Sequence, residues 1–584
     1  MSLQSDLHAA LTPARQGRYK AAIKAARAGM RRHKSHPAFP NIAATALCAL
    51  GKEREAVPLF RKALALAPDF HDARRNLAQA YLGLGQPDRA GKLLQRLVTD
   101  LPRDDGAWLL LAVASEATGD LPAAETAVGQ ALALAPRNRA ALLRRAALRN
   151  RMGLSRGALD DYMAAADLDP ADPGVALELA ALLMYLTRDD DAIAVLNRAI
   201  AVSPDHAGLR AELANRLLAA GDRDRAIATF RAALELAPDD AETLDQLALA
   251  LPTGDLPALR TRITDALSRT PSGSADHATL MFALAHAGTR AGDAAAMDHL
   301  KQANDETAAL TPYDAAGEAA FTDTIRARFP APARVEPVED TDGPVPIFVL
   351  GMPRSGTTLA EAVLGAHDAV VPLGERRVGD LLFPWLQSGR PLDAGDIARI
   401  RRTDRANLPD LPEGTSAYVD KMPENHRLAG FLKTIWPEAR IIHLRRDPRD
   451  TALSLWRARF PAGRLAYAYD RAAMAHRFNL YAGIMAHWRQ VMPGNILEIT
   501  YESLVSDPGA TSRELARFCG LDWQSGMAQP DRHAGQVRTL SVHQLRQPVH
   551  TRSVGQWRDH ADLLAPFIEA LDPELWPELA DATD

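Results

Sequence analysis

The chain has 584 residues, of which 47% are hydrophobic and 24% are charged, and its formal net charge is −5. This length exceeds what one core supports, so two or more domains are expected, and the negative balance gives no support for nucleic-acid binding. The two cysteines, Cys48 and Cys519, argue against a disulfide framework and suit a reducing, cytoplasmic location. We expect neither a signal peptide nor a membrane span, because no sufficiently long apolar segment occurs.

The first part of the chain contains a sequence pattern that recurs every 34 residues; for example, prolines stand at positions 68 and 102. Prolines recur at this spacing, glycines recur in the same frame with Thr187 in one place, and an alanine follows five positions after each of these. The prolines are Pro68, Pro102, Pro136, Pro170, Pro204 and Pro238; the glycines are Gly17, Gly51, Gly85, Gly119, Gly153 and Gly221; the alanines are Ala22, Ala56, Ala90, Ala124, Ala158, Ala192 and Ala226. Each unit is therefore predicted to be two closely packed helices joined by a turn at the glycine.

This pattern resembles the tetratricopeptide repeat. The resemblance implies an all-α superhelix of about seven repeats over residues 1–255, whose concave face binds a protein or peptide. The array could equally scaffold or dimerise the rest of the chain, because repeat architecture does not specify a ligand. Residues 256–335 are predicted to be a helical connector and linker, since 330–346 is rich in Pro, Asp and Glu.

Residues 336–584 are predicted to form an α/β domain with a mostly parallel sheet, because short β-rich segments alternate with helical stretches. These segments are 345–350, 369–371, 417–420, 440–444 and 496–500. Arg354, Glu375, Lys421 and Arg446 each follow one of the segments. Ligands of such sheets lie beyond the carboxyl ends of the strands, so these four residues are expected to share a site.

The stretch GMPRSGTTL, 351–359, is close to the phosphate loop GxxxxGK[ST], but Thr357 stands where that loop has its lysine. A glycine turn between a strand and a helix presents backbone N–H groups to an anion, and Arg354 could clamp the same anion. The stretch therefore predicts a site for a nucleotide 5′-phosphate without a triphosphate tail. The predicted contacts are Pro353, Arg354, Ser355, Gly356, Thr357 and Thr358.

GMPRSGTTL resembles the 5′-phosphosulfate loop of sulfotransferases, which have a P-loop-like fold and use 3′-phosphoadenylyl sulfate as co-substrate. The stretch IIHLRRDPRDTALSLW, 441–456, strengthens the resemblance, which implies that Arg446 and Ser454 hold the 3′-phosphate of the donor. Further stretches resemble tyrosylprotein sulfotransferases and their bacterial tetratricopeptide relatives. They are HDAVVPLGERRV at 367–378, YVDKMPENH at 418–426, ITYESLVSDP at 499–508 and TLSVHQLRQPVHTRSVGQWR at 539–558.

The resemblance implies roles for single residues. Glu375 would be the general base, and Lys421, Arg354 and Ser541 would stabilise the charge that develops on the bridging oxygen. The remaining implied donor contacts are Tyr501, Ser541, Gln544, Arg552 and Arg558. The sequence departs from the family at Gln556, where a lysine is expected, and at Ala458 beside Arg457, where an arginine is expected. No metal is predicted, because a sulfuryl group carries less charge than a phosphoryl group.

Three functions follow from these features. The first is a sulfotransferase whose acceptor is the hydroxyl of a protein tyrosine, a glycan, a lipid or a small molecule, recruited by the repeats. The second is a variant P-loop kinase, which the missing lysine and missing metal carboxylates disfavour. The third is a repeat scaffold with a degenerate sulfotransferase domain. The repeats leave a homodimer open.

Overall fold

The computed structural model describes residues 2–330, 343–461, 463–530 and 549–582. The chain divides into two compact units, Met1–Pro170 and Ala171–Asp584, and each is described by itself. Most of the predicted linker, and two predicted site residues, Ser541 and Gln544, lie outside the described residues. No helix among the described residues is long and apolar enough to cross a membrane.

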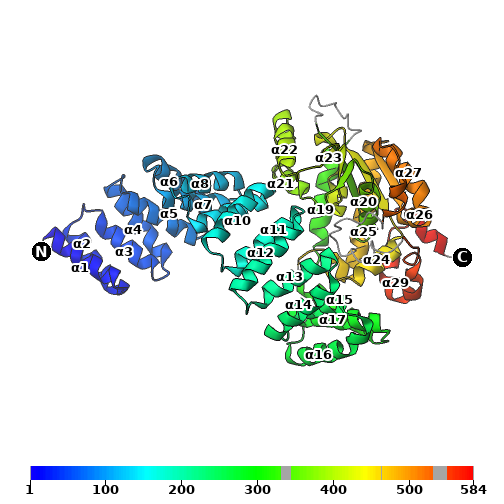
Figure 1. Ribbon diagram of the computed structural model, residues 1–584. Coiled ribbons are helices and arrows are strands. Elements are labelled where there is room, and N and C mark those ends of the chain that lie inside the picture. The colour runs from blue at the N-terminus through cyan, green and yellow to red at the C-terminus, as the bar shows by residue number, and fades with distance from the viewer. Residues whose placement is uncertain (1, 331–342, 462, 531–548, 583–584) are drawn as a thin grey trace. The chain divides into compact units, whose positions relative to one another are not determined.

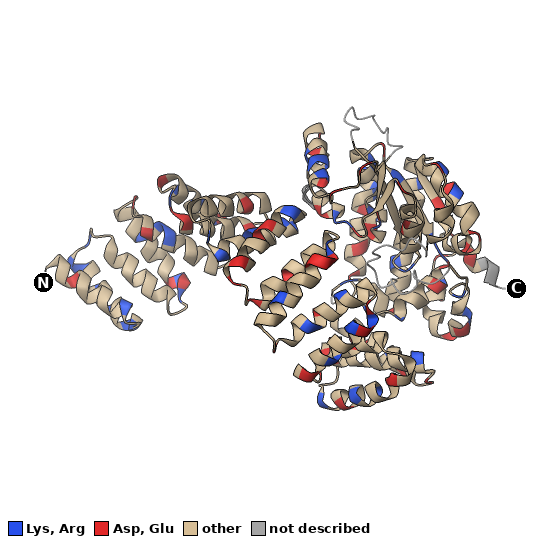
Figure 2. Ribbon diagram, in the orientation of Figure 1, with Lys and Arg blue, Asp and Glu red and all other residues tan. Residues whose placement is uncertain are grey.

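The first unit consists of helical hairpins in which consecutive helices pack together (Figure 1). Its helices are α1 (Leu3–Arg15), α2 (Tyr19–Arg32), α3 (Ala38–Cys48), α4 (Glu53–Leu66), α5 (His71–Gly83), α6 (Pro87–Asp100), α7 (Asp105–Ala117), α8 (Leu121–Leu134), α9 (Arg139–Arg151) and α10 (Ser155–Leu168). Charged residues of both signs are spread along them (Figure 2).

The second unit opens with helices that continue the 34-residue frame and then leave it. The helices in the frame are α11 (Pro173–Tyr185), α12 (Asp189–Val202), α13 (Ala207–Ala220), α14 (Arg223–Leu236) and α15 (Ala241–Ala250). They are followed by the 3₁₀ turn η1 (Thr253–Asp255) and by α16 (Leu256–Arg269), α17 (Ala275–Ala291), α18 (Ala296–Leu310) and α19 (Ala315–Arg328). The structure therefore contains a tetratricopeptide-like array that is followed by further helices.

The repeat positions behave as their residue types predict. The six glycines of the frame have φ between 67° and 92°, a left-handed region that L side chains avoid. Thr187, which replaces the seventh glycine, adopts φ 65° as well. Every alanine of the frame is 0% exposed, so these positions let the paired helices approach closely. The repeat interpretation is confirmed.

The α/β part contains a five-stranded parallel sheet with strand order β2-β3-β1-β4-β5. The strands are β1 (Val345–Gly351), β2 (Val370–Pro372), β3 (Ala417–Asp420), β4 (Arg440–Arg445) and β5 (Ile496–Thr500). Each coincides with a predicted segment to within one residue at either end. The predicted fold class, repeats followed by a parallel α/β domain, is confirmed.

Helices cover both faces of this sheet. Alternate residues of β1 point to opposite faces, so Ile347 and Val349 pack on α20 and α27, whereas Phe348 and Leu350 enter a larger core. The larger core also takes side chains from α17, α18 and α19, such as Phe282. The connector helices are therefore part of the core that supports the sheet. The domain limits at 255 and 335 remain predictions.

The remaining elements connect and flank the strands. They are α20 (Thr357–Gly365), α21 (Val378–Ser388), α22 (Ala394–Ala406), η2 (Pro423–Arg427), α23 (Ala429–Ile435), α24 (Pro448–Trp456), η3 (Ala466–Tyr469), α25 (Arg471–Val491), α26 (Tyr501–Ser506), α27 (Pro508–Cys519), η4 (Ser525–Ala528), η6 (Gln556–His560), α29 (Ala561–Glu569) and η7 (Pro577–Ala582).

Candidate functional site

The loop between β1 and α20 has a backbone that few residue types could adopt. Gly356 has φ 98°, and a Cβ there would lie 2.5 Å from Cδ2 of Tyr501. A Cβ at Gly351 would lie 2.5 Å from the carbonyl oxygen of Leu444. Arg354 itself has φ 70°, and non-glycine residues held in this region concentrate at functional sites. The two glycines are thus required by close packing.

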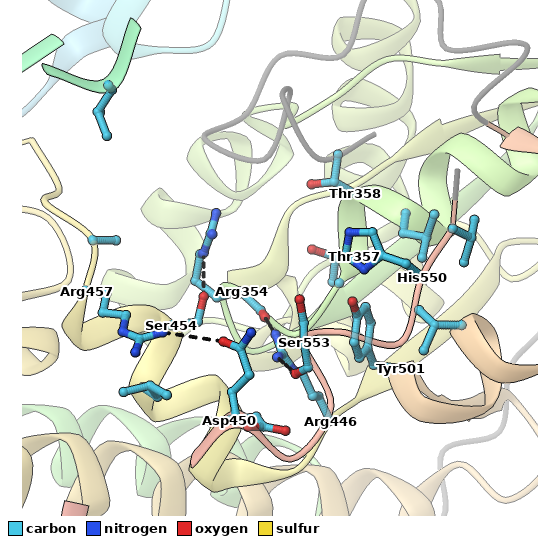
Figure 3. Close-up of a pocket in the computed structure, with 18 of the residues that line it drawn as sticks. Arg354, Thr357, Thr358, Arg446, Asp450, Ser454, Arg457, Tyr501, His550 and Ser553 are labelled. Carbon is cyan, nitrogen blue, oxygen red and sulfur yellow. Dashed lines mark hydrogen bonds between the residues drawn. The ribbon is translucent and has the colours of Figure 1, made fainter. Parts of the chain in front are cut away.

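A cavity of about 360 Å³ lies beyond the carboxyl ends of β1, β4 and β5 (Figure 3). This volume falls in the usual range for sites that enclose a small molecule. Seven of the predicted donor residues line it. They are Arg354, Gly356, Thr357, Thr358, Arg446, Ser454 and Tyr501. The structure therefore brings together residues that are up to 147 positions apart in sequence (354 to 501).

Four arginines line the cavity, and two of them, Arg354 and Arg446, lie close to the loop. Nε of Arg354 donates to Oγ of Ser454 at 3.1 Å, and Nη1 of Arg446 donates to the carbonyl oxygen of Arg354 at 3.0 Å (Figure 3). Burial, followed by the neighbouring charge of Arg446, lowers the pKa of Arg354 to about 10. A bound anion would relieve this repulsion, so the pair favours an anionic ligand.

Arg446 also joins the loop to the segment after residue 548. Its Nη2 donates to the carbonyl oxygen of Ser553 at 2.6 Å, and its guanidinium lies 4.6 Å from the centre of the Tyr501 ring. Asp450 fixes the same segment, because its carboxylate accepts the backbone N–H groups of Gly555 at 2.6 Å and Trp557 at 2.9 Å. The segment is thereby held against α24 beside the cavity.

Several buried polar atoms of this region lack a hydrogen-bond partner within the described part of the chain. Among them are Oγ of Ser355, Nε of Arg446 and Nε of Arg457. A buried donor without an acceptor is costly, and such atoms at a phosphate-type loop are what an anionic ligand would satisfy. This observation fits a nucleotide with phosphate groups at the loop and at Arg446.

Glu375 and Lys421 form an ion pair that is separate from the residues lining the cavity. Nζ of Lys421 lies 2.7 Å from Oε1 of Glu375, and the side-chain exposures are 1% and 40%. The pair meets because β2 and β3 are adjacent parallel strands: the backbone N–H of Lys421 donates to the carbonyl oxygen of Gly374 at 2.9 Å. The predicted base and lysine are thus in contact with each other, with the carboxylate open to solvent.

Buried charges surround the loop that carries Glu375. The guanidinium of Arg376 pairs with Asp404 at 2.7 Å. Burial raises the pKa of Asp420 to about 8, opposed by the charge of Arg376. The hydroxyl of Tyr185, on repeat helix α11, accepts the backbone N–H of Arg377 at 2.9 Å. The loop is therefore tied both to the sheet and to the repeats.

The other predicted residues are placed as follows. Pro353 and Ser355 belong to the loop but are not among the residues that line the cavity. Arg552 and Arg558 are exposed and also do not line it. The two departures from the family pattern, Gln556 and Ala458, do line it. Among the described residues no group of three or more His, Cys, Asp or Glu could hold a metal ion.

Sequence reasoning missed several lining residues. Asp245, Gln246 and Leu249 on α15 and His286 on α17 lie outside every motif, and Ser553 lies within the stretch 539–558 but was given no role. Asp450 stands inside RRDPRDT, where its role as a backbone acceptor could have been suspected from its position in the first turn of a helix. Nothing in the sequence marks Tyr185 as a functional residue, because it lies at the end of a repeat helix whose sequence is otherwise ordinary.

Comparison with known protein families agrees with both halves of the structure. A model described as "Sulfotransferase family" matches residues 346–525, and one described as "Tetratricopeptide repeat" matches 47–112 and 188–249. Residues 346–525 therefore form a domain of the sulfotransferase family and the helical array contains tetratricopeptide repeats, as the motifs predicted.

Each of the following proteins is similar to only part of this chain. A protein of Aquifex aeolicus (strain VF5), named only as uncharacterized, is 33% identical over 255 residues, which is 39% of this chain and 34% of that protein. A putative protein-tyrosine sulfotransferase of Caenorhabditis briggsae is 25% identical over 253 residues, 38% of this chain and 88% of that protein. Among solved structures, MamA from Desulfovibrio magneticus RS-1 is 22% identical and covers 29% of this chain and 97% of its own, with a TM-score of 0.28.

Proposed function

We propose that the protein is a sulfotransferase that moves a sulfuryl group from 3′-phosphoadenylyl sulfate to an acceptor hydroxyl. The observation that carries the proposal is the cavity lined by Arg354, Thr357, Thr358, Arg446 and Ser454, where Nε of Arg446 is buried without a hydrogen-bond partner among the described residues. Its loop lacks the lysine that reaches the β- and γ-phosphates of a nucleoside triphosphate. A nucleotide with separate 5′ and 3′ anionic groups suits this distribution of positive charge better than a triphosphate does.

The proposed reaction assigns a task to each residue. The Glu375 carboxylate accepts the proton of the acceptor hydroxyl, and the acceptor oxygen forms a bond to sulfur. The bond between sulfur and the bridging oxygen breaks, and adenosine 3′,5′-bisphosphate leaves with the electron pair. Lys421 and Arg354 stabilise the charge on that oxygen. Because Lys421 pairs with Glu375 at 2.7 Å in this structure, the lysine exchanges that contact for the departing oxygen during the reaction.

The acceptor is proposed to be a tyrosine in a peptide, brought to the exposed Glu375 by the repeats. The similarity to proteins named protein-tyrosine sulfotransferase supports this choice. So does the contact of repeat helix α11 with the loop that bears Glu375. The repeats would then act as the recruiting surface for the same polypeptide that carries the acceptor.

Calorimetric titration with adenosine 3′,5′-bisphosphate, beside ATP with magnesium, tests the proposal. Binding of the bisphosphate with no binding of ATP is the expected result. Binding of ATP alone would favour a variant kinase, and binding of neither would favour a scaffold with a degenerate domain. Turnover of the sulfate donor with a tyrosine peptide then separates an active enzyme from a protein that only binds the nucleotide.

A further inference from the structure

One wall of the cavity comes from outside the residues that match the sulfotransferase model. Asp245 on α15 and His286 on α17 line the cavity together with Ser454 and Arg457 of the α24 region. All four residues belong to the compact unit Ala171–Asp584. The helix α15 continues the repeat frame, so the repeat array and the connector reach the nucleotide site directly.

His286 is held between a carboxylate and a backbone carbonyl. Its Nδ1 donates to Oδ1 of Asp245 at 2.7 Å, and its Nε2 donates to the carbonyl oxygen of Arg457 at 3.1 Å. Since neither oxygen carries a hydrogen, both ring nitrogens must be protonated for both bonds to form. Burial lowers the pKa of His286, but the charge of Asp245 and the hydrogen bonds to Asp245 and Arg457 together outweigh it, so the pKa is raised.

The histidine caps the end of α24. The last carbonyl groups of a helix have no partner within the helix, and a cation near them is favourable. His286 satisfies the carbonyl of Arg457, and Nδ2 of Asn304 donates to the carbonyl of Trp456 at 3.1 Å. These two side chains from the connector therefore fix the direction in which the chain leaves α24.

The two arginines that follow differ in their charge partners. Arg459 is paired with Asp245 at 2.8 Å and with Glu242 at 2.5 Å. Arg457 forms no ion pair with any residue in the described ranges; its bonds go to Oε1 of Gln556 at 3.4 Å and Nε2 of His560 at 2.6 Å. Burial lowers the pKa of Arg457. Arg457 is thus a half-buried cation on the cavity wall whose charge an anionic ligand would compensate.

We infer that Asp245 and His286 are positioning residues of the nucleotide site, which hold the backbone at Arg457 so that its guanidinium meets the 3′-phosphate of the nucleotide. The inference rests on the proposed function, because it takes the ligand to be a 3′-phosphorylated nucleotide. It makes the end of the repeat array part of the donor site, in addition to any role in binding the acceptor.

His286→Ala tests the inference, with His277→Ala as the matched control. His277 lies on the same helix, and its Nδ1 is 2.7 Å from Oε2 of Glu306, with an exposure of 12% against 13% for His286. It does not line the cavity. Titration with adenosine 3′,5′-bisphosphate is expected to show about tenfold weaker binding for His286→Ala and a change within about twofold for His277→Ala.

A conservative variant separates positioning from general stability. His286→Gln keeps a donor that can reach the Arg457 carbonyl, so we expect its affinity to stay within about threefold of the wild type. Adenosine 5′-monophosphate, which lacks the 3′-phosphate, should lose much less affinity than the bisphosphate in His286→Ala. Should His286→Ala not fold, Asp245→Asn replaces it, with an expected loss of about fivefold.

The outcomes distinguish this inference from the proposed function. If the wild-type protein does not bind the bisphosphate, the proposed function fails and the inference falls with it. If the wild type binds and the 286 and 277 variants lose affinity alike, the inference alone is overturned. Equal losses for the two nucleotides in His286→Ala would also overturn it, because Arg457 would then have no special relation to the 3′-phosphate.

Discussion

Glu375 touches Lys421, a lysine that is 1% exposed, while remaining 40% exposed itself. A base must reach the acceptor, and a buried lysine must keep a partner to stay charged. The ion pair meets both needs before a substrate arrives. The two residues also follow adjacent parallel strands: Lys421 comes directly after β3, and Glu375 lies in the short loop after β2.

Replacement of Glu375 by Gln is therefore expected to remove transfer while leaving nucleotide binding intact. Gln can still accept a hydrogen bond from Lys421, but it cannot take the acceptor proton, so transfer should fall at least about a hundredfold. Affinity for adenosine 3′,5′-bisphosphate, measured by calorimetry, should change by no more than about threefold. Release of the bisphosphate from the sulfate donor in the presence of a tyrosine peptide reports transfer.

Asp380→Asn is the control for this change. Asp380 is a nearby carboxylate that pairs with Arg377 and not with Lys421. It should retain most of the transfer activity. Retained activity in Glu375→Gln, or loss of nucleotide binding in that variant, would contradict the assignment of the base.

The role of Arg446 can be tested by comparing its alanine variant with the alanine variant of the preceding residue, Arg445. Arg446→Ala should weaken adenosine 3′,5′-bisphosphate by about ten- to hundredfold, because a charge-assisted contact to the 3′-phosphate is lost, and adenosine 5′-monophosphate by no more than about threefold. Arg445→Ala is the control, since Arg445 pairs with Glu578 at 2.6 Å and does not line the cavity. If Arg446→Ala weakened the binding of both nucleotides equally, Arg446 would not be the residue that binds the 3′-phosphate.

Motif residues could be predicted from the sequence because their spacing reflects one local element. Arg446 and Ser454 lie on a strand end and the helix that follows, and Gly351 and Gly356 frame one turn. Contacts between helices that are far apart in the sequence produce no such spacing pattern. The bond from His286 to the carbonyl of Arg457 spans 171 positions and uses a backbone atom, which any residue at 457 would supply.

At the level of elements, the turn between α11 and α12 is the strained member of its series. Thr187 adopts φ 65°, where the other repeats have glycine. A β-branched residue with a positive φ destabilises the folded state by roughly 1–3 kcal/mol. Glycine avoids this strain, but its larger conformational entropy in the unfolded chain offsets part of the gain. The sequence predicted this turn from the frame alone, since the glycine pattern fixed the position before the residue type was considered.

Thr187→Gly is expected to raise the free energy of unfolding by about 0.5–1 kcal/mol. Thermal unfolding followed by circular dichroism measures the effect. Thr118→Gly provides the contrast, because Thr118 stands at the end of α7 with φ −89°, a conformation that any residue adopts. It should lower stability. A destabilising effect of Thr187→Gly would mean that the threonine side chain makes a contact worth more than the backbone strain.

The five strands were predictable for a different reason from the cavity. Buried parallel strands are short apolar runs, and each run in the sequence became a strand. The strand order β2-β3-β1-β4-β5 then decides which loops meet, and no local pattern encodes that order. The sequence therefore predicted that Glu375 and Lys421 would follow strands, but not that they would pair outside the residues that line the cavity.

At the level of the whole polypeptide, the helices that precede the sheet serve the site in two places. Asp245 and His286 hold the wall beside Arg457, and Tyr185 holds the loop beside Glu375. One contact lies beside the cavity and the other at the proposed base. The helices α17, α18 and α19 also share the core of the α/β part. Removal of the helical part would thus expose that core and release both contacts.

Tyr185→Phe tests whether the second contact affects the reaction. The variant leaves the backbone N–H of Arg377 without its buried acceptor, so the loop that carries Glu375 should be less well ordered. We expect transfer to fall roughly three- to tenfold, while affinity for adenosine 3′,5′-bisphosphate stays within about twofold because Tyr185 does not line the cavity. The same donor-release and calorimetric measurements apply.

Tyr81→Phe is the matched control, because the Tyr81 hydroxyl accepts a bond from Nε of Arg61 at 3.0 Å inside the first unit. It loses its hydrogen bonds to Arg61, which belongs to the same unit. Transfer by this variant should match the wild type. If both tyrosine variants transfer equally well, the repeats only support the fold near Glu375; if only Tyr185→Phe is impaired, the repeat array takes part in setting the geometry of the base.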